Sequence, residues 1–90
     1  MSFYRSKISF NNQRNIPLVI VIEPWGEDYS LMPGEQLELL AYGRNGTPWF
    51  HVVEWDDSSQ VYCEDADSFK VVQQNVELKC GHNRQEVWDG

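Results

Sequence analysis

Apolar and polar side chains alternate with a period of two along most of this chain, and this spacing predicts short β-strands. Residue propensity alone also permits a helix at residues 35–41. The Asn45-Gly46 dipeptide that follows favours a strand there, paired in a hairpin with residues 48–55, because both turn positions tolerate a positive φ. We expect strands over residues 3–10, 16–23, 29–32, 37–42, 48–55, 60–64, 69–72, 76–80 and 85–88.

The longest uninterrupted run of β-favouring apolar residues, residues 18–22, is expected to form the central strand. Successive positions are apolar on both sides of this run, which is typical of a strand that is buried on both faces. A second sheet, the chain ends or a partner subunit would then have to cover each face. Pro24 lacks an amide hydrogen and ends the strand, and Gly26 lets the chain turn.

Turn signals every few residues and the absence of a helical period indicate an all-β fold. The 90 residues are expected to form one domain, residues 1–90. A chain of this length buries roughly 60–65% of its unfolded surface, enough to fold without disulfides. The expected architecture is a small β-sandwich or flattened barrel of about seven or eight short, mostly antiparallel strands.

The formal net charge of −7 narrows the choice of partners. Nucleic acid and anionic membranes bind basic surfaces, so neither is expected as a partner. No apolar stretch approaches the roughly 18 residues of a membrane helix, and the N-terminus lacks the pattern of a signal peptide. Cys63 and Cys80 are too few for a disulfide framework. We therefore expect a cytoplasmic protein with free thiols.

Aromatic residues make up 13% of the chain, and those in turns are the best candidates for contacts with a partner. Trp25, Glu27 and Tyr29 follow the central strand, and we predict that they form a binding surface. Trp49 and Trp55 fall within a strand pattern and are expected in the core. No catalytic constellation accompanies them. The predicted function is a non-catalytic binding module without a cofactor, whose partner is another protein or a second copy of the chain.

One local motif carries a resemblance to known proteins. The sequence Glu-Pro-Trp-Gly-Glu at residues 23–27 is followed by a Pro-Gly-Glu turn at residues 33–35 and a Leu-rich strand. Over about residues 18–42 this pattern resembles a group of small, functionally uncharacterised bacterial all-β domains. The resemblance implies an all-β fold and a bacterial, intracellular setting. It implies no activity, because none is established for that group.

A second pattern supports an alternative function. His51, Cys80 and His82 offer one thiolate and two imidazoles, a ligand set that suits copper or zinc. The order of these features along the chain is similar to that in cupredoxin-like sandwiches. In both, a turn with Pro and Gly precedes a strand, a His follows, and a late loop supplies Cys and His. That resemblance implies a metal-binding or redox protein. The visible absorption and metal content of the purified protein would separate it from a binding module.

Overall fold

The computed structural model describes residues 3–84, and within them every regular element is a β-strand. Each strand arises where the alternation of side chains is strongest, because a strand turns successive residues to opposite faces. In chain order the strands are β1 (Tyr4–Asn11), β2 (Leu18–Glu23), β3 (Glu27–Leu31), β4 (Gln36–Gly43), β5 (Trp49–Glu54), β6 (Ser58–Glu64), β7 (Ser68–Gln73) and β8 (Val76–Leu78).

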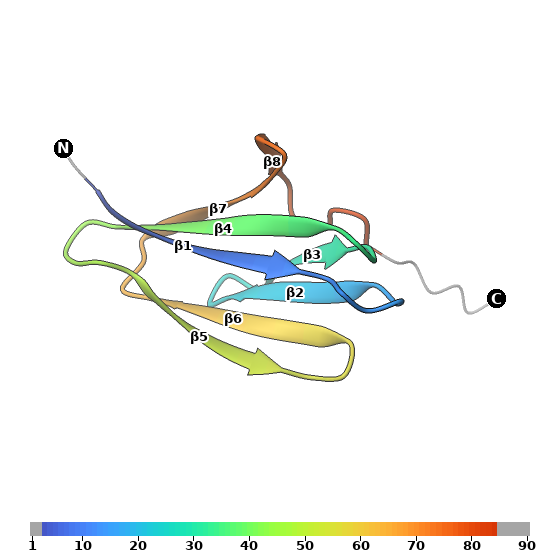
Figure 1. Cartoon of the computed structure of the whole chain (residues 1–90). Helices are drawn as coiled ribbons and strands as arrows, with labels where there is room; N and C mark the ends of the chain where they lie inside the picture. Colours follow the sequence, from blue (N-terminus) through green and yellow to red (C-terminus); the bar gives the residue numbers. More distant parts are fainter. Residues whose placement is uncertain (1–2, 85–90) are drawn as a thin grey trace.

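The strands form two four-stranded sheets that pack as the two layers visible in Figure 1. One sheet has the order β1-β4-β7-β8 and the other the order β3-β2-β6-β5. Neighbouring strands are antiparallel, except that β2 and β6 run parallel. The predicted all-β sandwich of mostly antiparallel strands is confirmed.

The Asn45-Gly46 turn does not close a hairpin, so that prediction is wrong. β4 is a strand as expected, but it pairs with β1 on one edge and with β7 on the other. β5 pairs instead with β6, so the segment between β4 and β5 carries the chain from one sheet to the other. The hairpin signal is local, whereas both edges of β4 are filled by strands distant in sequence.

Alternate residues of each strand point between the sheets and form the core. On β2 this rule buries Leu18, Ile20 and Ile22, while Val19 and Val21 stay half-buried on the outer face. The expectation that β2 is covered on both faces is therefore wrong, because the second sheet covers one face only. The buried apolar residues are Leu18, Ile20, Ile22, Tyr29, Leu31, Leu37, Leu39, Ala41, Val61, Cys63 and Val71.

Two glycine turns lie where the sequence predicts them. Gly26, between β2 and β3, has a φ of +70°, and its amide donates to the Ile22 carbonyl at 2.8 Å. Gly34, between β3 and β4, has a φ of +84°. Residues with a side chain are strained at these φ values, which explains the choice of glycine.

The last described segment leaves the sheet. β8 covers only the first part of the strand predicted at residues 76–80, and residues 79–84 then run beside β3. The strand predicted at residues 85–88 lies outside the described residues. Within residues 3–84 no helix has the length and apolar character needed to cross a membrane.

Candidate functional site

Residues 79–84 cover the edge of β3 that β2 does not use. The Ser30 amide of β3 donates to the His82 carbonyl at 2.8 Å, and the Gly81 amide donates to the Asp28 carbonyl at 2.7 Å. These bonds satisfy backbone groups on the edge of β3 that could otherwise pair with a strand of another chain. We call β3, β8 and residues 79–84 the closed side of the sandwich.

An ion pair fastens this segment to β3. Nε and Nη2 of Arg84 donate to the two carboxylate oxygens of Asp28, at 3.0 and 2.5 Å. These hydrogen bonds hold the pKa of Asp28 below its usual value. The exposed Cys80 thiol lies beside the pair, with Sγ 3.8 Å from Asp28 Oδ1. Arg84 and Asp28 therefore neutralise each other, and their ion pair holds residues 79–84 against β3.

Of the predicted binding residues, Glu27 and Tyr29 lie on β3 of the closed side and Trp25 lies in the turn just before it, and both aromatic side chains take part in packing. Tyr29 is only 3% exposed, and its hydroxyl donates to Glu27 Oε1 at 3.2 Å. Burial, with the Glu27 charge, raises the pKa of Tyr29 far above its usual value. The half-buried Trp25 ring packs on Phe69, with ring centroids 4.6 Å apart. Glu27, Tyr29 and Phe69 line a shallow depression of about 260 Å³.

The three predicted metal ligands do not converge. His51 lies on β5 and His82 beside β3, at opposite edges of the sheet with the order β3-β2-β6-β5. Four strand spacings separate them, about 19 Å in total, whereas imidazoles that share a metal ion each lie about 2 Å from it. Within the described part of the chain, no three His, Cys, Asp or Glu side chains are grouped as a metal site requires. Cys80 lies near His82 only.

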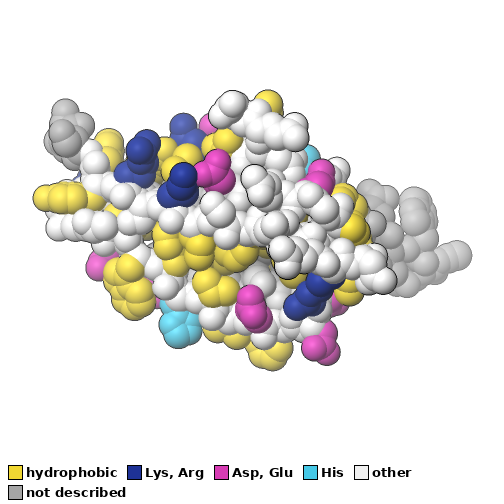
Figure 2. All heavy atoms as spheres, viewed as in Figure 1, with side chains coloured by type: hydrophobic (Ala, Val, Ile, Leu, Met, Phe, Trp, Pro, Cys, Tyr) yellow, Lys and Arg dark blue, Asp and Glu magenta, His cyan; other side chains and the backbone are white. Residues whose placement is uncertain are grey.

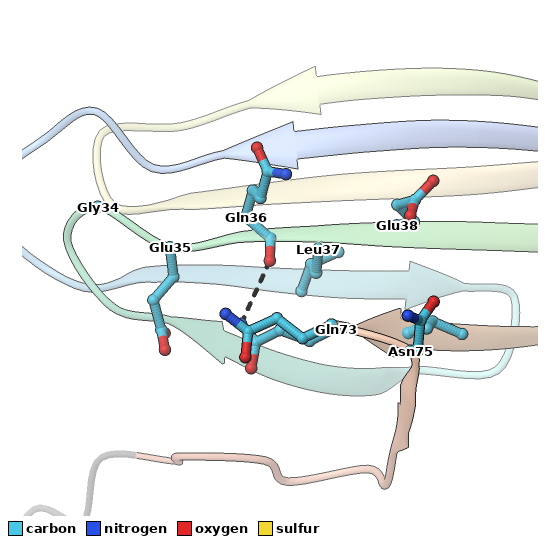
Figure 3. Close-up of a pocket in the computed structure, with 9 residues that line it drawn as sticks. Gly34, Glu35, Gln36, Leu37, Glu38, Gln73 and Asn75 are labelled. Carbon is cyan, nitrogen blue, oxygen red and sulfur yellow. Dashed lines mark hydrogen bonds between the residues drawn. The ribbon is translucent and has the colours of Figure 1, made fainter.

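A wider depression of about 440 Å³ lies at the ends of β4 and β7 (Figure 3). Gln73 Nε2 donates across it to the Gln36 carbonyl at 3.3 Å, while the Gln36 side chain points away. Its lining residues include no aromatic or basic side chain and come largely from two polar turns. This depression therefore carries no functional assignment.

The side of the sandwich formed by β1 and β5 is not covered by any segment within residues 3–84. Among residues 3–84, β1 pairs with β4 alone and β5 with β6 alone. Core-facing side chains stay half-buried here, including Ile8 and Phe10 on β1 and Phe50 and Val52 on β5. Figure 2 shows hydrophobic side chains in a band between the two layers on this side. We call β1, β5 and the gap between them the open side.

The outer face of β5 carries the tryptophans that the sequence pattern assigned to the core. Trp49 and Trp55 are 53% and 56% exposed, so that expectation is wrong. His51 and Val53 lie between them on the same face. Tyr62 of β6 meets the His51 ring edge-on, with centroids 6.0 Å apart. We name Trp49, His51, Val53, Trp55 and Tyr62 the aromatic face.

The sequence contains a signal that could have found this face. β5 and β6 form a hairpin, and its register sets Trp49 opposite Glu64 and Val53 opposite Gln60. Directly opposite residues share a face of the sheet, so both β5 side chains lie on the polar side of β6. The Trp55 indole then donates to Gln60 Oε1 at 3.1 Å. Tryptophans aligned with polar partners belong on the outer face.

Charge separates the two sheets. The strands β2, β3, β5 and β6 contain no Lys or Arg. The other sheet carries Arg5, Lys7 and Lys70, with Lys7 paired to Glu38 at 3.0 Å. In Figure 2 Lys and Arg side chains gather at the upper left, over the layer that holds β1 and β4, and a further one lies at the lower right. The aromatic face therefore lies on an acidic sheet, whose strands hold Glu23, Glu27, Asp28, Glu54 and Glu64.

Comparisons of this chain with protein-family models, with curated proteins and with solved structures returned no match. The resemblance of residues 18–42 to small bacterial β domains therefore stays a prediction. The functional argument depends on the geometry of the two sides and on the aromatic face.

Proposed function

We propose that this protein is a non-catalytic binding module that recognises another protein through its aromatic face. The observation that carries the proposal is the exposure of Trp49 and Trp55, at 53% and 56%, on a sheet face. Tryptophan is enriched among the residues that dominate binding energy at protein interfaces. Leaving two such side chains in water forgoes stabilisation that burial would give, and a partner that covers them recovers it.

The aromatic face is better suited to binding than the predicted turn surface. Trp25 packs on Phe69 and Tyr29 is buried, so little of either ring is free for a partner. The aromatic face lies on two paired strands, and its backbone is already ordered. Ordering on binding therefore costs less than it would for a loop. Trp25, Glu27 and Tyr29 form the second surface to test.

The charge of the surrounding sheet supports a protein partner. Phosphate groups need Lys or Arg, which strands β2, β3, β5 and β6 lack, so nucleic acid falls outside the proposal. A protein surface with basic residues complements this sheet. A second copy of the chain also offers basic residues, on its β1-β4-β7-β8 sheet. We place the interaction in the cytoplasm, where thiols such as Cys80 stay reduced.

Affinity capture with matched variants tests the proposal. Wild-type protein, the Trp49→Ala/Trp55→Ala double variant and Val76→Ala are immobilised, and the proteins bound from a bacterial lysate are quantified. Val76 is 61% exposed on β8 and serves as the control for loss of an exposed apolar side chain. We expect at least one protein to be recovered equally on wild type and Val76→Ala and about tenfold less on the double variant.

Equal recovery on all three baits would contradict the aromatic face as the binding surface. Loss of recovery on a Trp25→Ala bait, with the double variant unaffected, would move the site to the closed side. Sedimentation velocity of wild type and of the double variant decides whether the partner is a second copy. A concentration-dependent dimer that the double variant lacks would identify self-association.

A further inference from the structure

The free edge of β5 offers backbone groups that are ready to pair with another strand. The Trp55 amide donates to the Ser58 carbonyl at 2.8 Å, so these residues form a hydrogen-bonded pair of the hairpin. Hydrogen-bonded pairs alternate along an antiparallel ladder, and the register continues without a break. The amides and carbonyls of Phe50, Val52 and Glu54 therefore point away from β6 and toward solvent.

We propose that β5 binds an extended, cationic segment of the protein partner as an added strand of the β3-β2-β6-β5 sheet. This inference rests on the proposed function and names its binding mode and the chemistry of the partner. The added strand uses the outward-facing amides and carbonyls of β5 as main-chain partners. Because β5 has 6 residues, the matching segment is about 20 Å long.

β1 also has a free edge, but its charged side chains disfavour the pairing of another strand there. The Asn12 amide donates to the Glu35 carbonyl at 2.9 Å, and the same alternation turns the backbone groups of Arg5 and Lys7 outward. Both residues are exposed, and charged side chains of this kind protect sheet edges from further pairing. β5 contains no Lys, Arg or Pro. Of the two strands on the open side, β5 is the one free to accept a partner.

Acidic residues flank β5 at both ends and favour a cationic partner. Glu54, Asp56 and Asp57 lie at the turn into β6, and Glu64 lies opposite Trp49 at the other end. Lys or Arg near both ends of an added strand complements these carboxylates. A second copy of β5, paired antiparallel, would instead bring Glu54, Asp56 and Asp57 of one copy to the end of the other copy where Glu64 lies. Charge therefore favours a basic segment of another protein over pairing of β5 with itself.

The side chains of an added strand would meet apolar surface on both faces. On the outer face they lie beside Trp49 and Val53, and on the inner face beside the half-buried Phe50 and Val52. Side chains on both faces of the added strand can therefore gain burial at the open side. The expected segment carries β-branched residues at its centre and basic residues toward its ends.

A synthetic peptide tests this binding mode directly. The probe is the blocked peptide Lys-Lys-Val-Thr-Val-Thr-Val-Lys-Lys, and its control has Glu in place of every Lys. Binding is followed by tryptophan fluorescence and by amide chemical shifts of the whole chain. We expect the lysine peptide to bind and the glutamate peptide to bind at least about tenfold more weakly at low salt, with the difference shrinking as salt is added.

A proline substitution on β5 separates strand addition from simple charge attraction. Val52→Pro removes an amide that makes no bond to β6, and edge strands tolerate proline at such positions. Val52→Ala truncates the same side chain, so it loses part of the inner-face contact but keeps the amide. We expect Val52→Pro to bind the lysine peptide at least about tenfold more weakly than Val52→Ala. Glu54→Pro and Glu54→Ala repeat the comparison if Val52→Pro does not fold.

Each outcome of these experiments decides the proposal. Shifts confined to β5 and its neighbours, with loss of binding in the proline variant, support it. Equal binding by the proline and alanine variants, equal binding of both peptides, or no peptide binding overturns it. If lysate capture still depends on Trp49 and Trp55 while Val52→Pro changes nothing, the proposed function stands and strand addition fails. A dimer lost in Val52→Pro, without peptide binding, replaces the cationic partner by a second copy.

Discussion

Within residues 3–84, the chain completes one side of its sandwich and leaves the other side open. On the closed side, residues 79–84 occupy the free edge of β3 through backbone hydrogen bonds and the pair between Arg84 and Asp28. On the open side, among residues 3–84, no segment covers the edge of β5. In the described part of the chain, four of the six exposed large hydrophobic residues lie on the strands of the open side or directly beside them in sequence: Phe3, Tyr4, Trp49 and Trp55. The other two are Ile16, in the loop before β2, and Val76 on β8.

This difference shows how three sheet edges are protected and one is not. The β3 edge is covered by the chain itself, and β8 is only 3 residues long. Arg5 and Lys7 place charge along β1. No segment within residues 3–84 covers the edge of β5, the strand contains no Lys or Arg, and tryptophans lie at both its ends. Because unprotected edges invite pairing, an edge left in this state is best explained by a partner that uses it.

Replacing one core residue on each side tests how differently the two sides are packed. Leu31 of β3 is fully buried, and we expect Leu31→Ala to lower the free energy of unfolding by about 3 kcal/mol. Val52 of β5 is half-buried, and Val52→Ala should cost about 1 kcal/mol. Urea denaturation measures both values. Equal losses would show that the open side is packed as tightly as the closed side.

Truncating one tryptophan on each side separates a packing role from a contact role. Trp25 packs on Phe69, and we expect Trp25→Ala to lower the free energy of unfolding by about 2 kcal/mol. Trp55 is exposed, and Trp55→Ala should change the free energy of unfolding by only about 0.5 kcal/mol. Thermal and urea unfolding provide the measurement. A larger loss for Trp55→Ala than for Trp25→Ala would reverse the assignment of the two surfaces.

Alkaline pH tests whether the core beneath β5 is dry. Burial, with a smaller effect of the Glu64 charge, raises the pKa of Cys63 from 9.0 to about 11. The unfolded chain therefore loses this proton first, and a contribution to stability that is present below pH 9.0 is lost as the pH rises toward about 11. The difference between the two pKa values sets an upper bound of about 3 kcal/mol on this loss.

The free energies of unfolding of wild type and Cys63→Ala are compared across this pH range. Tyr29, whose pKa is also raised, contributes equally to both proteins, so their difference belongs to Cys63. We expect that difference to fall as the pH rises above 9.0. A pH-independent difference would mean that the open side admits water to the core.

Loosening the closed side should produce a small change in stability and a local change in hydrogen exchange. Gly81 has a φ of +86°, and an added Cβ would lie 3.2 Å from Arg84 Nη2. We expect Gly81→Ala to cost about 1 kcal/mol. Hydrogen exchange should accelerate at the Ser30 amide, which donates to His82, and stay unchanged at the Val52 amide, which faces solvent already. Unchanged exchange at Ser30 would show that residues 79–84 do not protect β3.

The positions of strands were predictable because alternation is local. Each of the eight strands between residues 3 and 84 overlaps a predicted one. The candidate site was not predictable in the same way. Trp25 and Tyr29 belong to turn and strand positions that look exposed in sequence, yet Tyr29 is buried and Trp25 is half-buried against Phe69.

The sequence by itself determined the all-β class, the strands and the glycine turns at Gly26 and Gly34, because period-two alternation and a positive φ are properties of neighbouring residues. Only the tertiary structure decided that β2 runs parallel to β6 and that both edges of β4 are filled, leaving β5 at the margin. That arrangement in turn decided which tryptophans are covered. The physical reason is that burial of a face or an edge depends on strands distant in sequence, and no local pattern records which strands arrive.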